Sequence, residues 1–563
     1  MSTGKGPQAE RGPEMGAPRD TGPLEHDRQY QALRDHPLLA EFAHSRTKLA
    51  SDPYRPLYHF VNPEGGLNDP NGLCFWRGRW HLFYQSLPPG DSRWHWGHTV
   101  SDDLIHWRDL PYAITPGPEG ACWSGSTLVE PERVIAMYHG HGLGNMVATA
   151  SDPLLLDWRK VTGTTVIPNP RPIWTTTTGE ERMPGVGGNP VPAGAINFVY
   201  DPCIWKKDDV YYSTSGGTLP HRPSGTRTRA QFLYRSRDLE HWEYLHPFVE
   251  DDIFGLPGDD GGCPYFWPIG GTGTASDRHI LLHFSHLSGA HYLLGDYDRG
   301  RDRFVATSGG RFTFGPWYPG GVHAPTATPD GDGGVIALFN INPAKPTPGW
   351  NQIMSLPRRL SLAANDELAI EPAGAIESLR RDHHRIEPRE LPGNREVVLE
   401  GAGGTAIEIA AEIDPGEAQM VELNVLRAPG REEFTRIAFF RGRGYVDWDR
   451  SDGWTRHHES RDSVITVDTS YSSRLPDAES RAPETAPFFL PPGERLRLRV
   501  FVDRSVVEVF ANGRQCLAVR AYPGRGDSRG VSLRAQGADA HLQAMDIWRL
   551  ESMYPGGAEG DTR

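Results

Sequence analysis

The chain has 563 residues, of which 37% are hydrophobic and 23% are charged, and its formal net charge is −14 at pH 7. This length and composition are typical of a globular protein with two or more domains and a large core. The negative charge argues against nucleic acid or an anionic membrane as a partner, and it suits a neutral small-molecule or glycan substrate.

Cysteine usage and the first residues of the chain bear on its compartment. The five cysteines are scattered and odd in number, and none has CxxC spacing, so we expect neither a disulfide framework nor a zinc site. Residues 1–20 lack the apolar core of a signal peptide, and no stretch approaches the roughly 20 apolar residues of a membrane span. We therefore expect a cytoplasmic protein, and the sequence implies no metal ion or redox cofactor.

Residues 1–50 form an N-terminal extension in two parts. Residues 1–27 are rich in glycine, proline and charged side chains, a composition typical of a disordered segment. Residues 28–50 instead have helical character, with leucine and aromatic residues that can pack on the domain that follows.

Residues 51–365 have the pattern of a β-propeller. Short aromatic and β-branched runs are broken by glycine, proline and aspartate, as expected of many short strands. The motif Ser-Asp-Asp-Leu-Ile-His-Trp at residues 101–107 recurs in related form at residues 151–158 and 236–242. A blade of four strands takes roughly 40–50 residues. The longer second interval therefore predicts an insertion, which we place at residues 170–197, and the repeated tryptophans are expected to pack within blade hairpins.

The C-terminal part divides into a linker, a second domain and a tail. Residues 366–395 are charged and are expected to be a linker with a short helix at residues 376–381. Residues 396–552 alternate apolar and polar side chains with a period of two, which predicts an antiparallel β-sandwich. Asp503 and Glu508 fall on one alternating strand and are expected to be structural. Residues 553–563 are predicted to be a disordered tail.

One acidic residue, Asp69, stands inside the turn-like sequence Asn-Asp-Pro-Asn-Gly at residues 68–72. Pro70 fixes one backbone angle and Gly72 permits a positive one, so this segment is expected to be rigid. A rigid turn can hold a carboxylate in one orientation for catalysis. Taken alone, the same residues are better explained as backbone mimics in an ordinary turn, because Asp and Asn are common in turns.

These residues and several later motifs resemble glycoside hydrolase family 32, the invertase, inulinase and levanase family of β-fructofuranosidases. Residues 68–72 and 83–85 are similar to its opening signature. The remaining matches follow in order and extend the resemblance from about residue 55 to about residue 550; they lie at residues 96–98, 101–107, 123–126, 354–358, 501–505, 508–510 and 512–513. The resemblance implies an all-β fold, a five-bladed β-propeller followed by a C-terminal β-sandwich.

The resemblance assigns two acidic residues and exposes one departure. Retaining hydrolysis uses two carboxyl groups about 5–5.5 Å apart, one as nucleophile and one as acid and then base. Asp69 matches the family nucleophile. Asp201, in Tyr200-Asp201-Pro202, matches an acid that holds sugar hydroxyls in an Arg-Asp-Pro motif. Tyr200 stands in place of the arginine and cannot supply a guanidinium fork.

A second departure concerns the acid/base residue. The family motif Glu-Cys-Pro is matched by residues 262–264, but Gly262 occupies the position of the acid and cannot transfer a proton. Asp260 or Asp259 can replace it from just upstream, another carboxylate can serve, or hydrolysis has been lost. We favour Asp260, with a pKa raised by burial or by a neighbouring carboxylate, although the pair can also be a solvated turn. The other carboxylates considered are Glu250, Asp251 and Asp252.

The remaining pocket residues are assigned by position in the motifs. Each can equally belong to the core, and the histidines His286 and His291 are left out of the catalytic set because a lone histidine is more often structural. The residues expected to contact the substrate are Asn68, Gln85, Trp96, Trp123, Ser124 and Tyr200.

The function expected from the resemblance is retaining hydrolysis of β-fructofuranosides such as sucrose or short fructo-oligosaccharides. Two alternatives stay open at this point. The altered second and third motifs can mark a different furanoside or transfer to a sugar acceptor. Gly262 can also mark a propeller that binds sugar without cleaving it, although a binder would not require the intact motif around Asp69.

Overall fold

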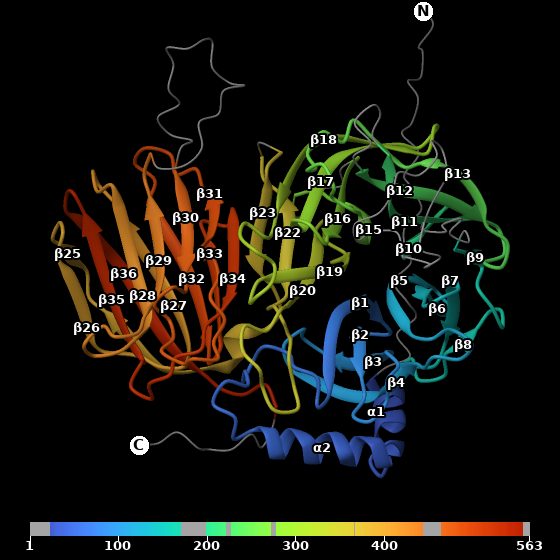
Figure 1. Cartoon of the computed structure of the whole chain (residues 1–563), viewed down its shortest axis with the longest axis horizontal. Coiled ribbons are helices and arrows are strands. Elements are labelled where there is room, and N and C mark those ends of the chain that lie inside the picture. The colour runs from blue at the N-terminus through green and yellow to red at the C-terminus, as the bar shows by residue number, and fades with distance from the viewer. Residues whose placement is uncertain are drawn as a thin grey trace, which may run out of the picture.

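The computed structural model describes residues 23–169, 199–220, 227–271, 277–364, 366–442 and 463–554. The predicted insertion at residues 170–197 lies outside this part of the chain, as do residues 1–22 and 555–563 of the predicted disordered ends. A ring of sheets built by the N-terminal part lies beside a stack of two sheets built by the C-terminal part (Figure 1). None of the described helices is long and apolar enough to cross a membrane.

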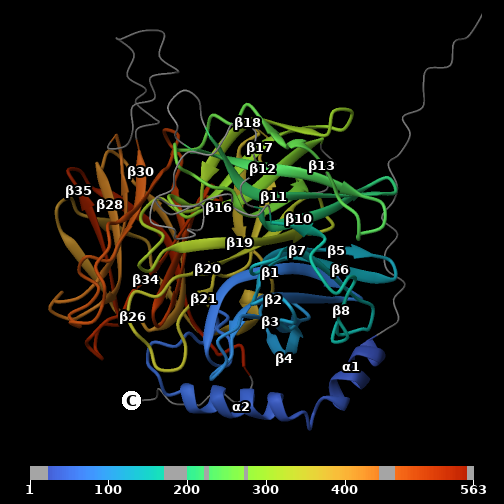
Figure 2. The same cartoon turned by 45° about the vertical axis from the view of Figure 1, so that its right-hand side comes forward.

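Two helices, α1 (Pro23–Ala32) and α2 (Pro37–Leu49), lie beneath the first sheet of the ring (Figure 1 and Figure 2). Phe42 of α2 is buried. Arg46 of α2 donates a hydrogen bond of 2.6 Å to Asp109 in that sheet. The N-terminal extension therefore packs on the propeller through the buried Phe42 and the Arg46–Asp109 ion pair.

Apart from the two-residue strand β14 (Val249–Glu250), the strands of the ring pair antiparallel, and most pair with the next strand along the chain. This meander follows from the tight turns between the short apolar runs. The first sheets contain β1 (Gly66–Trp76), β2 (Arg79–Leu87), β3 (His95–Ser101), β4 (Trp107–Ile114), β5 (Cys122–Glu130), β6 (Arg133–Gly140), β7 (Gly144–Ala150), β8 (Arg159–Lys160), β9 (Ile167–Pro168), β10 (Tyr200–Lys207), β11 (Val210–Pro220), β12 (Arg227–Ser236) and β13 (Glu243–Pro247).

The later sheets of the ring have small additions to the same plan. The two-residue strand β14 joins one edge in parallel with β18, and β21 pairs with β20 beside the main path. These sheets contain β14 (Val249–Glu250), β15 (Gly262–Pro268), β16 (Arg278–Ser285), β17 (Gly289–Asp298), β18 (Arg303–Arg311), β19 (Val322–Pro329), β20 (Val335–Ile341), β21 (Ile353–Met354), β22 (Arg358–Leu362) and β23 (Leu368–Pro372).

The ring closes through one strand from each sheet. β1 contacts β5, β5 contacts β10, β10 contacts β15, β15 contacts β19, and β19 contacts β1 again. This closed cycle of strands is the arrangement of a β-propeller. Side chains at one end of these strands converge near the axis even though they are far apart in sequence, and the site described below is built from them.

The repeated Ser-x-Asp-Leu-x-His-Trp motif forms the turn before the outer strand of a sheet. In the turn before β4, Asp103 accepts hydrogen bonds from the backbone of Ile105 and His106. Asp238 accepts the equivalent bonds before β13. The leucine after each aspartate has a positive φ, 69° at Leu104 and 70° at Leu239. The motif is therefore structural, and its histidines lie on the rim of the propeller.

The C-terminal domain is a sandwich of two antiparallel sheets. Alternation of apolar and polar residues along each strand places one face of each sheet in a common core. One sheet contains β24 (Arg380–Ile386), β25 (Arg389–Leu391), β36 (Ala540–Leu550), β27 (Ala406–Asp414), β32 (Leu496–Asp503), β33 (Val506–Ala511) and β34 (Gln515–Arg520), and the other contains β26 (Glu396–Gly403), β35 (Gly530–Gln536), β28 (Met420–Arg427), β29 (Thr435–Phe440), β30 (Val464–Asp468) and β31 (Glu484–Pro487).

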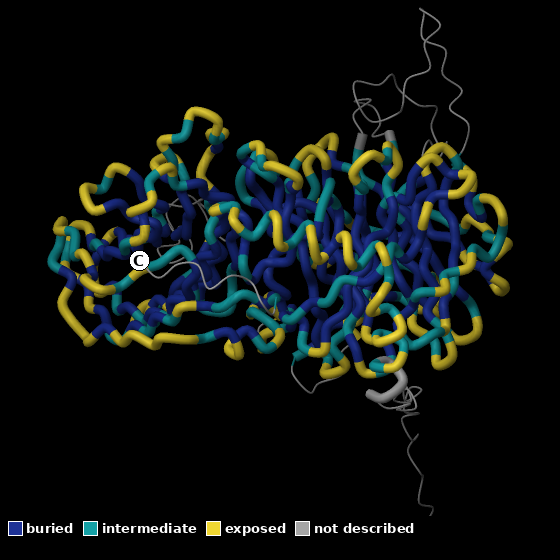
Figure 3. Tube along the Cα trace, turned by 90° about the horizontal axis from the view of Figure 1, so that it is seen from below, coloured by how far each residue is buried: buried dark blue, intermediate teal, exposed yellow. Residues whose placement is uncertain are grey.

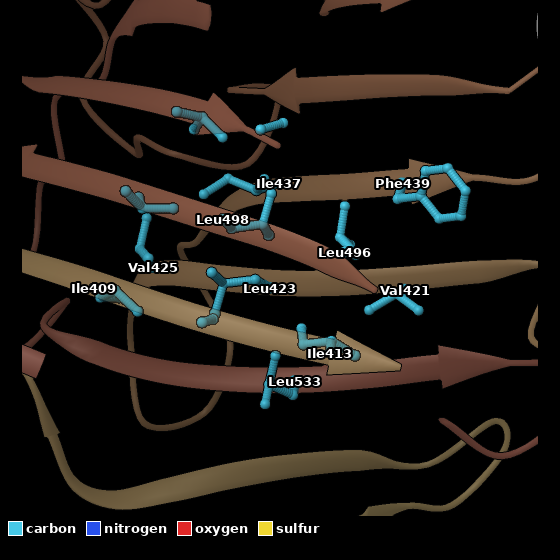
Figure 4. Close-up of a cluster of buried hydrophobic side chains, with 14 of the residues drawn as sticks. Ile409, Ile413, Val421, Leu423, Val425, Ile437, Phe439, Leu496, Leu498 and Leu533 are labelled. Carbon is cyan, nitrogen blue, oxygen red and sulfur yellow. The ribbon is translucent and has the colours of Figure 1, made fainter. Parts of the chain in front are cut away.

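Aliphatic side chains fill the space between the two sheets. Ile409 and Leu498 come from the first sheet, whereas Leu423, Ile437 and Leu533 come from the second, and all are buried (Figure 4). In the described part of the chain, buried residues fill the interior of both domains while exposed residues gather in the connecting loops (Figure 3).

The segment expected to be a linker, residues 366–395, differs from that expectation. It contains strand β23 of the propeller, a 3₁₀ helix (Ile376–Leu379) and strands β24 and β25 of the sandwich. β24 lies at the edge of its sheet and buries only Ile386 fully, so its charged side chains face solvent. Charged residues are usual on an edge strand, and this composition made a strand resemble a linker.

A buried ionic network joins the two domains. Asp503 accepts hydrogen bonds from the backbone of Leu57 and Tyr58 at 2.7 and 2.8 Å. Glu508 accepts 2.8 Å bonds from the Arg358 guanidinium and the Leu356 backbone. Both acids are fully buried, so the structural role predicted for them is confirmed.

Candidate active site

Asp69 lies on an irregular stretch of β1 rather than in a free turn. The pairing with β2 changes register on both sides of Pro70 and Asn71. Gly72 has a φ of 47°, and a Cβ there would lie 2.6 Å from Thr127 Cγ2. The predicted turn is therefore a bulged strand, because Pro70 has no N–H for a regular ladder and only glycine fits after it. Bulges of this kind re-aim side chains next to functional sites.

The two oxygens of the Asp69 carboxylate have different surroundings. Oδ2 accepts hydrogen bonds from Ser124 Oγ at 2.6 Å and from Gln85 Nε2 at 3.3 Å. No described residue donates a hydrogen bond to Oδ1, and the nearest basic atom is His323 Nδ1 at 3.7 Å. One oxygen is thus held in place while the other is free to react. The side chain keeps only a small exposed fraction, 8% for the whole residue.

Amide side chains behind Asp69 fix the donors that hold it. Asn68 Nδ2 donates to Gln85 Oε1 at 2.8 Å, and Gln352 Nε2 donates to Asn68 Oδ1 at 2.9 Å. Gln85 Nε2 also lies 2.7 Å from Ser124 Oγ. Asn68, Gln85 and Ser124, which were expected to contact substrate, therefore lie around Asp69, where they orient its carboxylate.

Asp201 faces Asp69 across the sulfur atom of Cys263. The Cys263 Sγ lies 3.5 Å from Asp69 Oδ2 and 3.5 Å from Asp201 Oδ2, and its backbone N–H donates to Asp201 over 3.1 Å. Asp201 and Cys263 have positive φ values of 49° and 47°. Such angles are costly for residues other than glycine and cluster at functional sites.

The pKa of Asp201 is raised to about 7. Burial is the main cause, and the negative charge of Asp69 is the next. The same burial and the same two carboxylates raise the pKa of the Cys263 thiol well above its usual value. Cys263 is therefore a neutral thiol here.

Gly262 points toward Asp201 and Tyr200. A Cβ at this position would lie 3.2 Å from Asp201 Oδ2 and 3.5 Å from Tyr200 Cε2. The tyrosine ring thus takes up space that a longer side chain at position 262 would need. The two departures from the family motifs, at positions 200 and 262, are therefore neighbours in space and compensate each other in volume.

Asp260 lies on the far side of Tyr200. Its Oδ2 accepts a 2.8 Å hydrogen bond from the Tyr200 hydroxyl and lies 2.7 Å from His286 Nδ1, while its Oδ1 accepts from the His286 backbone at 2.8 Å. Burial acts to raise the pKa of Asp260, but the bonds and charge of His286 outweigh it and the pKa is lowered. The expected rise in this pKa is thus wrong, because three donors stabilise the carboxylate.

The other carboxylates considered have partners of their own. Asp259 is fully buried and accepts hydrogen bonds from the Ser285 hydroxyl at 2.8 Å and from the Leu256 backbone at 2.6 Å. Glu250 pairs with Arg301 at 3.1 Å, and Asp252 pairs with Arg229. Asp251 is exposed in the loop after β14. In the described part of the chain, none of their hydrogen bonds or ion pairs reaches Asp69, Asp201 or Cys263.

The two predicted pocket tryptophans differ. Trp96 is completely buried, with 0% exposed surface, and its indole N–H donates to the Trp123 carbonyl at 2.8 Å. A direct contact between Trp96 and substrate is therefore wrong; the residue packs beneath the site, because its strand buries every side chain. Trp123 is half-buried, and its indole N–H donates to His141 at 3.0 Å. Its ring can therefore form one wall of a substrate pocket.

Sequence reasoning missed His323 and Trp317. The Trp317 ring stacks on the His323 ring with 4.9 Å between centroids, and His323 in turn faces Asp69. Burial lowers the pKa of His323 to about 4, so the imidazole is neutral. No quoted motif contains either residue. The one feature that could have indicated His323 is that a closed ring needs a strand beside β1, and that strand, β19, must direct some side chain toward the axis.

Comparison with known proteins follows the same two-domain division. Residues 59–372 match the glycosyl hydrolases family 32 N-terminal domain, and residues 375–549 match the family 32 C-terminal domain. The chain is 26% identical over 555 residues to a levanase of Bacillus subtilis (strain 168), covering 89% of this chain and 71% of the levanase. It is 28% identical over 544 residues to an Escherichia coli sucrose-6-phosphate hydrolase, covering 88% of this chain and 95% of that protein.

Solved structures agree on the fold. Fructan 1-exohydrolase IIa from Cichorium intybus superposes with a TM-score of 0.71 at 22% identity, covering 89% of this chain and 98% of the other. Sucrose-6-phosphate hydrolase from Lactobacillus gasseri gives 0.67 at 20% identity, covering 92% and 96%. The predicted propeller and sandwich are thereby confirmed. With both family domains matched across most of its length, the chain belongs to glycosyl hydrolase family 32.

Proposed function

We propose that the protein is a retaining glycosidase that hydrolyses β-fructofuranosides such as sucrose or short fructo-oligosaccharides. The observation that carries this proposal is the Asp69 carboxylate, one oxygen held by Ser124 and Gln85 and the other free, facing Asp201 at the axis of the propeller. Relatives named as a levanase and a sucrose-6-phosphate hydrolase support fructosides as the substrate class.

Each acidic residue has a distinct part in the proposed double displacement. Asp69 attacks the anomeric carbon and forms a covalent glycosyl intermediate, which water later hydrolyses. Asp201, held by the Cys263 backbone, binds sugar hydroxyls. The acid/base group is proposed to belong to the cluster formed by Asp260 and its hydrogen-bonded neighbours, since Gly262 supplies no proton-transfer group.

The number of blades, the domain boundaries and the cellular location are part of the same proposal. The sheets of the ring are proposed to be five blades, as in the family, with the catalytic domain running from residue 51 to the end of β23 and the sandwich from β24 to residue 552. We also propose a cytoplasmic location, supported by five cysteines that are all buried and free. The substrate is a small carbohydrate.

The experiment that tests the proposal measures fructose release from sucrose, an inulin-type trisaccharide and an aryl β-fructofuranoside. Asp69→Asn should lower kcat/KM by about 10⁴-fold or more on every substrate, because it removes the nucleophile. The matched control is Asp157→Asn, an exposed rim residue that should retain activity. Fructose release by Asp69→Asn at the wild-type rate would refute the assignment.

Because Gly262 removes the family's acid, a second candidate function is a propeller that binds sugar without catalysis. Such a protein would bind fructosides, seen by calorimetry, while releasing no fructose in any of these assays. Transfer to a sugar acceptor is distinguished separately by product analysis with and without added acceptor.

A further inference from the structure

A cluster of three titratable side chains lies beside the two axial carboxylates. Tyr200 begins β10, Asp260 precedes β15 and His286 follows β16. β15 and β16 are antiparallel and pair Gly262 with Phe284. Continuing this register outward places Asp260 opposite His286, which explains why two residues far apart in sequence meet at the end of one hairpin.

The Asp260 carboxylate is saturated by this arrangement. Oδ1 accepts from the His286 backbone N–H at 2.8 Å. Oδ2 accepts from the Tyr200 hydroxyl at 2.8 Å and lies 2.7 Å from His286 Nδ1. A carboxylate with three donors keeps its charge, so Asp260 has no proton to give to a leaving group.

The imidazole of His286 presents its other nitrogen outward. Nδ1 is bound to Asp260, which fixes the orientation of the ring, and no described residue forms a hydrogen bond with Nε2. The side chain is 67% exposed, whereas that of Asp69 is 11% exposed. His286 therefore lies nearer to solvent than the nucleophile.

Aromatic contacts tie His286 to the far side of the site. The Trp317 indole N–H donates to the His286 carbonyl at 3.0 Å, and the same ring stacks on His323. His323 in turn lies 3.7 Å from Asp69 Oδ1. Tyr200, which adjoins Asp201 in the chain, donates a hydrogen bond to Asp260, which in turn bonds to His286. A continuous series of contacts therefore links Asp201 to Asp69, and His286 is part of it.

We propose that His286 is the acid/base residue of the hydrolysis, replacing the carboxyl group that Gly262 lacks, and that Asp260 is its positioning residue. This inference rests on the proposed function. Tyr200 completes the unit by donating a hydrogen bond to Oδ2 of Asp260, the same oxygen that lies against His286 Nδ1.

Two proton transfers at Nε2 complete the reaction. First, an Asp69 oxygen bonds to the anomeric carbon as the bond to the leaving oxygen breaks, and the Nε2 proton moves to that oxygen, giving a free alcohol and a neutral imidazole. Second, Nε2 takes a proton from water as the water oxygen bonds to the anomeric carbon. The ester bond to Asp69 breaks, and carboxylate and imidazolium are restored.

Electrostatics support both roles of the imidazole. Burial acts to lower the pKa of His286, but the hydrogen bond and charge of Asp260 outweigh it, and the charges of Asp201 and Asp69 add to the rise, to about 9. The group is thus protonated before the first step. Once Asp69 is an ester its charge, the smallest of these contributions, is absent, so the pKa of His286 falls toward the range in which the ring acts as a base. The other titratable groups near it are Tyr200 and the neutral His323.

The test compares His286→Gln on two substrates with different leaving groups. Sucrose releases an alkoxide that needs a proton, whereas an aryl β-fructofuranoside releases a stable phenolate. We expect His286→Gln to lose about 10²–10⁴-fold in kcat/KM on sucrose and less than about tenfold on the aryl substrate. Added imidazole should restore part of the lost activity in His286→Ala. His241→Gln is the matched control, since His241 is also paired with an aspartate, Asp238, but lies on the rim.

A second measurement separates positioning from packing. Asp260→Asn removes the charge that raises the pKa of His286, so the basic limb of the pH profile should move to lower pH. Equal losses on both substrates in His286→Gln, or no loss on either, would overturn the proposal, as would a leaving-group effect found in Asp201→Asn instead. A wild-type protein that releases no fructose refutes the proposed function and this inference together, whereas an active wild type with an unaffected His286→Gln refutes the inference alone.

Discussion

Replacing Gly262 by glutamate restores the carboxylate of the family motif, yet we expect this single change to be harmful. The Cβ would lie 3.2 Å from Asp201 Oδ2, closer than an ordinary van der Waals contact, and 3.5 Å from the Tyr200 ring. One of these neighbours must move to admit the longer side chain. Overpacking of this kind costs about 1–3 kcal/mol in the free energy of unfolding.

The charge of Gly262→Glu adds to the steric cost. Two like charges about 4 Å apart repel by about 4 kcal/mol at an effective dielectric constant of about 20. Protonation of one carboxyl relieves part of this, so we expect a total loss of about 3 kcal/mol at pH 8. The loss should shrink at pH 5, because a carboxyl group whose pKa is raised in the folded state destabilises that state as the pH increases.

The companion change Tyr200→Arg should rescue the variant. It removes the ring beside position 262 and supplies a guanidinium partner for the new carboxylate. Urea unfolding of the wild type, both single variants and the double variant should give a coupling energy of about 1–3 kcal/mol. If the effects of Gly262→Glu and Tyr200→Arg on the free energy of unfolding add within about 0.5 kcal/mol, positions 200 and 262 are not coupled and the reasoning is refuted. Gly262→Gln is the uncharged control, and an equal loss for Gln and Glu at both pH values would refute the electrostatic part.

Three further predictions concern single side chains. The pKa of Asp201 is raised to about 7, so its ionisation opposes folding increasingly from about pH 4, where the unfolded carboxyl ionises, and fully above pH 7. Asp201→Asn should therefore raise the Tm at pH 8 and leave it nearly unchanged at pH 4, and a lower Tm at pH 8 would contradict this. Glu508→Gln leaves the Arg358 guanidinium buried with its charge unpaired and should cost about 3–5 kcal/mol in urea unfolding, against about 0–1 kcal/mol for the exposed control Glu243→Gln. Cys263 should resist iodoacetamide at pH 8 until denaturant is added, since burial and the charges of Asp201 and Asp69 raise the pKa of its thiol. Labelling of Cys263 in the native protein, measured by peptide mass spectrometry, would contradict this prediction.

The sequence could predict the parts of the site that lie inside continuous motifs. Asp69, Ser124 and Asp201 each fall in a short segment whose residue types reflect one local need, and the ordered series of motifs indicated both domains. The alternation of residues 396–552 likewise indicated the sandwich, because side chains of a strand point alternately to core and solvent.

What the sequence could not predict depends on contacts between strands. The pairing of Asp260 with His286 follows from the register of β15 and β16, which no single segment specifies. The same is true of Trp96, whose burial is decided by the sheet around it. His323 belongs to no motif and reaches Asp69 only because β19 closes the ring against β1.

The most direct test of the central claim is the stereochemistry of methanolysis, measured by proton NMR. With an aryl β-fructofuranoside in dilute methanol, attack on a covalent Asp69 intermediate would give methyl β-fructofuranoside as the first methylated product. The α-anomer would instead indicate a single displacement and would contradict a nucleophilic Asp69, and the absence of any cleavage would contradict the enzymatic function itself.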